Sequence, residues 1–232
     1  MQLRDYSFSN PSDNLAYDEL LLQLADKHDA GEFLRFWESP SYFIVLGRIG
    51  KIDIDVNQET TRRDNIPVLR RSSGGGTVLQ GVGCLNYTFV LSKQKYPILN
   101  DLRRSYEWIS TKVIDALAQQ GVEAVFRPIS DIATPQEKKI SGNAQHRGKN
   151  YILHHGTILY NFNLPLVSTY LKMPIDMPDY RKSRIHQDFV VNVPIEPLPF
   201  KRSLASLMGI PFNPQVPTEQ ELLALSKIPK IL

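Results

Sequence analysis

The sequence predicts an α/β (α+β) protein with a mixed β-sheet flanked by helices. Short runs rich in β-branched and aromatic residues are typical of strands. They alternate with longer segments whose apolar residues recur at helical spacing. Because this alternation is irregular, we expect both parallel and antiparallel strand pairs in one sheet.

The N-terminal part predicts one helix and one hairpin. The helix begins at residues 10–13 (Asn-Pro-Ser-Asp), where proline occupies an early helical position. Residues 33–37 and 42–46 are short aromatic and β-branched runs, and Ser-Pro-Ser at 39–41 predicts a β-hairpin between them. The apolar face of the helix is formed by Ala16, Leu20, Leu21 and Leu24.

The central part predicts strands on both sides of a second helix. Residues 66–69 and 86–91 form strands that enter and leave a glycine run. A helix runs from Asp101 to about Gln120, and Gly121 ends it. Its apolar face is formed by Leu102, Tyr106, Ile109, Val113 and Leu117. Three further strands are expected at 122–126, 139–143 and 151–160.

The composition changes after Pro194. Six of the 16 prolines lie between residues 194 and 217, so we expect a proline-rich tail, 194–232, with two short helices. Thr218 and Glu221 have the spacing of a capping box for the second of these helices.

The whole chain, residues 1–232, is expected to form a single domain. It is 42% hydrophobic and carries a net charge of only +3, so no nucleic-acid partner is predicted. No apolar stretch is long enough to span a membrane, and the N-terminus lacks the apolar core of a signal peptide, so we expect a cytoplasmic protein without a membrane partner. The single cysteine, Cys84, excludes an internal disulfide and a cysteine-built metal site.

Residues 70–81, RRSSGGGTVLQG, combine two arginines with three consecutive glycines. Such a run is tolerated where the backbone turns sharply or approaches a ligand closely, and the arginines suggest an anion. A phosphate-binding P-loop requires Gly-Lys-Ser/Thr, and a dinucleotide fingerprint requires a helix after the glycines; neither is present. Taken alone, the run also fits a simple β-hairpin turn.

Residues 138–160, KKISGNAQHRGKNYILHHGTILY, contain a second group of polar residues. Lys139 precedes Ser141 and Gly142, and the pair His154-His155 precedes a glycine and a β-branched strand. A solvated lysine and packed histidines are the ordinary alternatives. Zinc is not expected, because helical i, i+4 spacing and a nearby carboxylate are missing.

The two segments together, with NLAYDELLL and FWESPSYFIVLGR, resemble the lipoate–protein ligase and octanoyl transferase family. The resemblance covers most of residues 14–170 and implies the biotin/lipoate ligase catalytic fold, which is related to class II aminoacyl-tRNA synthetases. It also implies ATP with Mg²⁺, an acyl-adenylate of lipoate or octanoate, and acyl transfer to a carrier lysine. The implied carriers are a lipoyl domain of a 2-oxoacid dehydrogenase or the glycine cleavage H protein.

The resemblance also assigns residues to this chemistry. It implies that Lys139 is the catalytic residue, acting as a fixed cation on the acyl carboxyl and phosphate oxygens. Asp131 would hold Mg²⁺ or the nucleotide, although a turn-capping role is the alternative on residue type alone. The implied substrate- and nucleotide-binding residues are Arg70, Arg71, Ser73, Gly74, Gly75, Gly76, Thr77, Asp131, Ser141, Gly142, His155 and Gly156.

The sequence also departs from the family pattern. Gln80 stands where the ligases commonly have histidine, and no cysteine occupies the positions that serve octanoyl transferases as acyl acceptors. A lone cysteine such as Cys84 is more often a packed small hydrophobe. We therefore favour the ATP-dependent ligase over a thioester transferase, with a non-catalytic binding protein as the third hypothesis.

Two further expectations concern the C-terminal part. The tail is not a full accessory domain, so activity could require a separate chain. Basic residues at 181–186 form either a solvated loop or a contact to phosphates or to an acidic carrier. These residues are Arg181, Lys182, Arg184 and His186.

Overall fold

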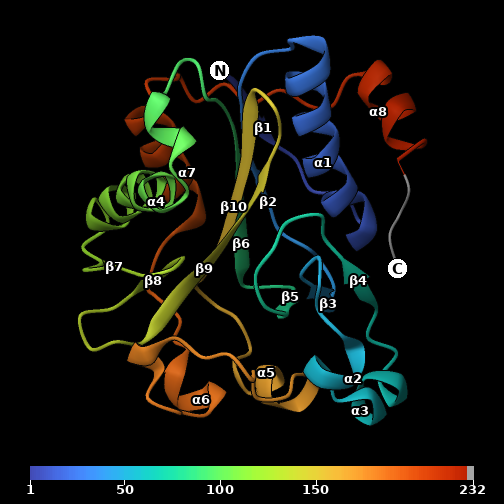
Figure 1. Ribbon diagram of the computed structural model, residues 1–232, viewed down its shortest axis with the longest axis vertical. Coiled ribbons are helices and arrows are strands. Elements are labelled where there is room, and N and C mark those ends of the chain that lie inside the picture. The colour runs from blue at the N-terminus through green and yellow to red at the C-terminus, as the bar shows by residue number, and fades with distance from the viewer. Residues whose placement is uncertain (229–232) are drawn as a thin grey trace.

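The computed structural model describes residues 1–228, and its centre is a seven-stranded sheet in the order β1-β2-β6-β10-β9-β8-β7 (Figure 1). β1 runs parallel to β2, whereas the other neighbouring strands pair antiparallel. The predicted mixed sheet is therefore confirmed. The strands are β1 (Gln2–Asp5), β2 (Phe33–Trp37), β6 (Cys84–Ser92), β7 (Val125–Arg127), β8 (Asp131–Ala133), β9 (Lys139–Arg147) and β10 (Tyr151–Leu159).

A second sheet of three strands has the order β4-β3-β5, with β3 (Phe43–Leu46), β4 (Val68–Arg70) and β5 (Val78–Gln80). The predicted hairpin of residues 33–37 and 42–46 is therefore wrong. β2 pairs with β1 and β6, whereas β3 pairs with β4 and β5. Both strands are buried along their whole length, so neither shows the alternating pattern that would reveal which face and which partner it has.

Helices cover both faces of the large sheet. On one side α1 (Pro11–His28) packs against α8 (Glu219–Leu225), and on the other α4 (Leu102–Ala118) packs against α7 (Pro197–Leu207) (Figure 1). The predicted start of α1 is confirmed, because Asn10 caps it and Pro11 is its first residue. The central helix and the capping box of α8 are confirmed as well.

Four short helices were not predicted, because each is too brief to show helical periodicity. They lie at the end of the molecule near the small sheet (Figure 1). Within residues 1–228, no helix combines the length and apolar character required to cross a membrane. The short helices are α2 (Ile52–Asp55), α3 (Gln58–Arg63), α5 (Pro165–Tyr170) and α6 (His186–Phe189).

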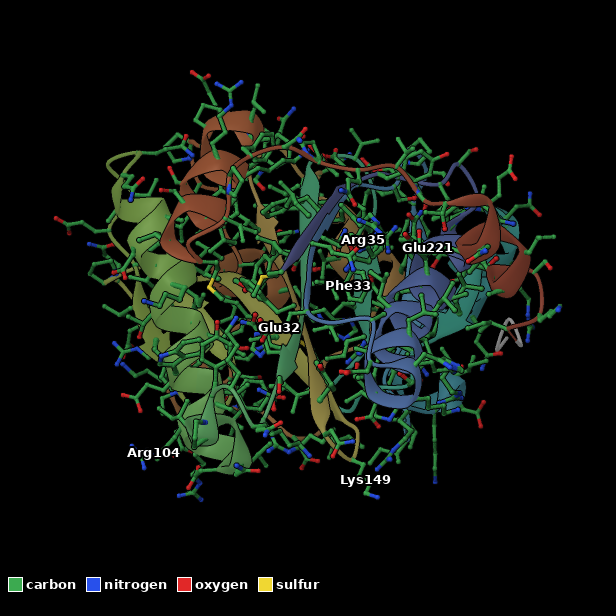
Figure 2. All side chains as sticks on the ribbon, turned by 90° about the horizontal axis from the view of Figure 1, so that it is seen from above. Glu32, Phe33, Arg35, Arg104, Lys149 and Glu221 are labelled. Carbon is green, nitrogen blue, oxygen red and sulfur yellow. The ribbon has the colours of Figure 1, made fainter. Side chains whose placement is uncertain are left out.

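A buried ion pair joins α1 to the large sheet. Arg35 Nη1 on β2 lies 2.6 Å from Asp18 Oδ1 on α1, and both side chains are almost completely buried (Figure 2, where Arg35 is labelled). Arg35 also donates to the Asn14 carbonyl oxygen and to Asn14 Oδ1, each at 2.8 Å. A buried charge is tolerated when it is paired and hydrogen-bonded in this way.

We expect Arg35→Met to lower the free energy of unfolding by about 3 to 5 kcal/mol, because the substitution leaves the Asp18 carboxylate buried without its cation. Chemical denaturation at neutral pH measures the change. Arg63→Met is the matched control, since Arg63 forms an ion pair with Asp64 at 2.8 Å but its side chain is 67% exposed. Equal, small effects of the two substitutions would contradict a stabilising role for the buried pair.

Candidate functional site

Arg71 organises the glycine-rich loop between β4 and β5. Its Nε donates to Ser73 Oγ at 2.9 Å, and its Nη2 donates to the carbonyl oxygens of Gly74 at 2.6 Å and Gly76 at 2.8 Å. Burial lowers the pKa of the guanidinium to about 10, so it stays charged at neutral pH. Arg71 therefore shapes the loop and also gives it a positive charge.

The glycines of this loop have different reasons to be glycine. Gly75 has a φ of +83°, in the left-handed region that favours glycine. A Cβ on Gly47 would lie 2.0 Å from the Gly75 carbonyl oxygen, so the end of β3 must also lack a side chain. A Cβ on Gly74 or Gly76 would meet no atom within 4 Å. The backbone there is open to an approaching ligand.

The two ends of the loop are attached to the segment before α3. Arg70 Nη1 donates to the carbonyl oxygens of Gly47 at 3.0 Å and Gly50 at 2.8 Å. Thr77 Oγ1 donates to Asp55 Oδ2 at 2.7 Å. Arg70 and Thr77, two of the predicted site residues, therefore anchor the loop.

Ser73 links the loop to the large sheet through His155. Ser73 Oγ lies 2.6 Å from His155 Nε2, and His155 Nδ1 lies 3.7 Å from Asp18 Oδ2. Burial by itself raises the pKa of Asp18, but the charge of Arg35 and the nearby imidazole of His155 outweigh it and hold the pKa below its usual value. The ionised carboxylate thus orients His155 towards the loop.

The predicted residues of β9 and β10 lie on two faces of the sheet. Side chains alternate along a strand, and His155 pairs in register with Ala144. Gly142 and His146 therefore share the α1 face with His155. Gly75 reaches this face too, because a Cβ on it would lie 3.8 Å from Ala144 Cβ.

Ser141 and Gly156 lie on the opposite face. Ser141 Oγ is 3.3 Å from Tyr87 OH, which also donates to Asn143 Oδ1. A Cβ on Gly156 would come within 2.0 Å of Asn143 Oδ1 and 2.4 Å of Tyr87 OH. The structure thus does not bring these two predicted residues to the glycine loop; they support a buried polar network beneath it.

Lys139 lies at the start of β9 in an ion pair. Its Nζ is 2.8 Å from Asp131 Oδ1, and Tyr180 OH donates to Asp131 Oδ2 at 2.7 Å. A Cβ on Gly142 would stand 3.0 Å from Lys139 Nζ, so the lysine lies flat against the strand. The sequence missed Tyr180, because a single tyrosine in an irregular segment gives no pattern.

A cavity of about 200 Å³ opens between α1, the glycine loop and β10, and we call it the α1 cavity. Arg71, Asp18 and Glu19 are among the residues that line it. A larger open depression of about 560 Å³ around Asp26 and Lys149 contains none of the predicted site residues. The α1 cavity is lined by, among others, Leu15, Ala16, Leu69, Leu153, His155 and Ile228.

A second polar cluster beside this cavity was not predicted. His146 Nδ1 lies 3.1 Å from Glu19 Oε2 and 3.0 Å from Ser72 Oγ, and Ser72 donates to the same carboxylate. The hydrogen bond with Glu19 raises the pKa of His146 above its ordinary value of 6.5. The three residues come from β9, α1 and the loop, so the cluster fastens the loop to both elements.

Cys84 is buried at the start of β6. Burial raises the pKa of its thiol to about 12, and Sγ donates a weak hydrogen bond to Gln80 Oε1 at 3.3 Å. The thiol packs among apolar side chains that include Leu46 and Phe162. It is a packed residue without the exposure or thiolate character of a nucleophile.

The basic residues at 181–186 are bonded within the protein. Arg181 stacks on Phe189, with 4.6 Å from its guanidinium carbon to the ring centre. Arg184 Nη2 donates to the Glu137 carbonyl oxygen at 2.9 Å, and Lys182 Nζ to Glu137 Oε2 at 2.7 Å. The segment therefore closes onto the β8–β9 turn instead of forming a free basic surface.

The metal assignment rests on one carboxylate. Asp131 is the predicted ligand, and its two oxygens contact Lys139 and Tyr180. Across residues 1–228, no cluster of three or more His, Cys, Asp or Glu side chains could hold a metal ion. Mg²⁺ commonly binds one or two carboxylates together with substrate phosphates, so Asp131 fits such a role if a nucleotide supplies the other ligands.

Known proteins share the sequence pattern of this chain. The family model described as "Lipoyl protein ligase A/B catalytic domain" matches residues 10–195. Lipoate-protein ligase LplJ of Bacillus subtilis is 30% identical over 188 residues, which cover 81% of this chain and 54% of the relative. Octanoyltransferase LipM of Oceanobacillus iheyensis is 28% identical over 75% of this chain and 69% of its own length. The chain spans about half the length of the curated ligases it matches.

Solved structures show the same fold. A lipoate-protein ligase A bound with ATP superposes with a TM-score of 0.81 at 23% identity, covering 97% of this chain and 92% of the other. The bi-partite lipoate protein ligase of Thermoplasma acidophilum gives a TM-score of 0.78 at 23% identity, with 97% and 90% covered. Both superpositions include most of the tail beyond residue 195.

The His146–Glu19 pair predicts a pH dependence of stability. Because folding raises the pKa of His146, its contribution is fully present below pH 6.5 and is lost as the pH rises through the raised value. We expect His146→Gln to cost about 0.5 to 1 kcal/mol at pH 5.5 and less at pH 8.5. Unfolding free energies across this range, with exposed His28→Gln as control, measure it; a pH-independent difference would contradict the prediction.

Proposed function

The chain belongs to the lipoyl protein ligase A/B catalytic domain family, and we propose that it is an ATP-dependent lipoate–protein ligase. It activates lipoate or octanoate as an acyl-adenylate and transfers the acyl group to a lysine of a lipoyl carrier domain. The observation that carries the proposal is one face of β9. A Cβ on Gly75 would lie 3.8 Å from Ala144 Cβ, and a Cβ on Gly142 would lie 3.0 Å from Lys139 Nζ, so the glycine loop and Lys139 both approach this face. His155, which pairs with Ala144, lines the α1 cavity on the same face.

Two steps make up the reaction. A carboxylate oxygen of the acid attacks the α-phosphorus of ATP, a P–O bond forms, and pyrophosphate leaves. The amine of the carrier lysine then attacks the acyl carbonyl, the bond to the AMP oxygen breaks, and the amine proton is lost to solvent. In both steps negative charge develops beside the acyl carbonyl and the α-phosphate, so a site with fixed cations and backbone N–H groups stabilises the transition states.

Each part of the site has its own role in these two steps. Lys139 is the cation for the carboxyl and phosphate oxygens, and it exchanges its contact with Asp131 for the substrate. The backbone at Gly74 and Gly76 is open to a ligand, so its N–H groups are assigned to the adenylate. Arg71 holds the loop in shape and adds positive charge. The acyl tail enters the α1 cavity beside His155.

Asp131 is the residue that would hold Mg²⁺, together with the nucleotide phosphates. When bound, the ion supplies neutralising charge to the phosphates. Tyr180 keeps the Asp131 carboxylate in a fixed orientation from its other oxygen. The Asp131 carboxylate would hold the ion when Lys139 contacts the substrate.

The carrier is a lipoyl domain of a 2-oxoacid dehydrogenase or the glycine cleavage H protein. The Thermoplasma acidophilum ligase is described together with its E2 lipoyl domain and as bi-partite, which supports both a lipoyl domain as acceptor and a separate accessory chain for this protein. The acyl acceptor approaches from the open side of the glycine loop.

An octanoyl transferase is the second candidate, because the LipM relative carries that name. Such an enzyme would pass the octanoyl group from acyl carrier protein through a cysteine thioester. Cys84 is 1% exposed and its pKa is raised, so it lacks both access to an acyl donor and thiolate character. This observation favours the ligase.

Lys139→Ala is expected to reduce adenylate formation at least about 100-fold, since removal of one fixed charge from a preorganised site typically costs about 3 kcal/mol. Lipoate-dependent exchange of labelled pyrophosphate into ATP measures this step. Lys138→Ala is the matched control, because Lys138 is the exposed neighbour. Full exchange activity in a folded Lys139→Ala protein would rule out the assignment; no exchange in the wild type would favour a non-catalytic protein.

Cys84→Ser separates the two enzyme classes. A ligase should keep most of its activity, because no step passes through the thiol and the serine hydroxyl can still donate to Gln80. Acyl transfer to a lipoyl domain is measured with ATP plus free octanoate and, separately, with octanoyl carrier protein. A thioester transferase would use only the carrier-bound donor, show an octanoyl adduct on Cys84, and lose activity in the variant.

A further inference from the structure

The chain beyond the family match runs around the edge of the large sheet. From α7, on the α4 side, it passes β1 and ends in α8 on the α1 side (Figure 1). The Gln215 backbone N–H donates to the Leu3 carbonyl oxygen at 2.9 Å, which attaches the crossing segment to the edge strand. We call residues 211–228 the wrapping segment.

A buried clamp holds the wrapping segment in place. Arg4 on β1 donates to Glu221 Oε1 at 3.0 Å and to Gln215 Oε1 at 2.9 Å. Tyr17 OH on α1 donates to Glu221 Oε2 at 2.9 Å. Glu221 is 8% exposed and Arg4 is 2% exposed (Figure 2, where Glu221 is labelled). This buried ion pair, with its hydrogen bonds, fixes α8 against α1 more specifically than apolar packing alone.

The clamp determines where the chain goes after α8. Leu225 is buried in the apolar cluster of α1, and Ile228 packs against the same cluster. Ile228 also lines the α1 cavity, together with Leu15 and Ala16. Ile228 of the wrapping segment therefore adds an apolar residue to the cavity wall. This residue lies outside the family match, residues 10–195.

The lining of the cavity limits the chemistry of its occupant. Its wall is aliphatic at Leu15, Leu69 and Leu153 and cationic at Arg70 and Arg71. The uncharged polar side chains in the wall are Ser12, Gln23 and Ser72. The two carboxylates in the wall are compensated: Asp18 by Arg35, and Glu19 by the hydrogen bonds of His146 and Ser72. A volume of about 200 Å³ is below that of pockets for drug-sized ligands, about 300 to 1,000 Å³. The cavity suits a short aliphatic chain.

We infer that Ile228 closes the α1 cavity and limits the length of the aliphatic chain that a medium-chain monocarboxylic acid places in it. The inference rests on the proposed function for the identity of the occupant. Ile228 is thus a specificity-determining residue, and the Arg4–Glu221–Tyr17 clamp positions it. Widening the wall at Ile228 frees volume for additional methylenes, and each methylene newly buried strengthens binding about fourfold.

Binding of hexanoate, octanoate and decanoate, measured by calorimetry without ATP, tests the inference. We expect Ile228→Ala to raise the affinity ratio of decanoate to octanoate about fivefold or more, and Ile228→Trp to lower octanoate affinity more than hexanoate affinity. Leu223→Ala is the matched control, because Leu223 is 66% exposed on α8; its ratios should equal those of the wild type.

The outcomes distinguish this inference from the proposed function. Unchanged affinity ratios in both Ile228 variants, or no binding of any of the three acids by the wild type, would overturn the inference. Normal binding with the expected ratio changes, but no pyrophosphate exchange, would leave the inference standing and contradict the ligase. Glu221→Gln provides a second check: it should change the ratio in the direction of Ile228→Ala, whereas a purely structural clamp would alter only the melting temperature.

Discussion

The arrangement of the site depends on the carboxylate of Asp18. It is buried between α1 and the sheet, and it contacts Arg35 at 2.6 Å, Thr88 at 2.8 Å and His155 at 3.7 Å. Three strands and one helix are thereby held by one negative charge. From His155 the connection continues to Ser73 and then to the guanidinium of Arg71. These contacts thus connect the glycine loop to an ion pair in the core.

This continuity explains which site residues the sequence could predict. The glycine run, Lys139 and His155 lie in motifs that resemble those of the family, so the sequence singles them out whatever their depth in the fold, and their roles stay predictions. Spacing alone could not separate the two faces of a strand when both are buried, so Ser141 and Gly156 were grouped with residues on the other face. Asp18, His146 and Tyr180 went unpredicted, because their roles arise only from contacts between distant segments.

The same limit applies to the fold. Long amphipathic helices and the capping box of α8 were predicted correctly, since caps and apolar spacing are local properties. The partners of β2 and β3 were not, because fully buried strands carry no alternation, and a short Ser-Pro-Ser link suits a change of sheet as well as a hairpin. The partners of a fully buried strand depend on contacts with segments distant in the sequence, and a local residue pattern does not show those contacts.

The charges of the site fall into two classes. Lys139 has a carboxylate partner in Asp131, and Glu19 has His146. Arg71 differs, because the hydrogen-bond partners that the structure gives it are uncharged oxygens of Val45, Ser73, Gly74 and Gly76. An anion that binds the glycine loop therefore gains attraction from Arg71 without breaking an ion pair. In the proposed reaction Lys139 exchanges the Asp131 carboxylate for another negative group, so its contact with substrate would depend on charge that the substrate itself brings.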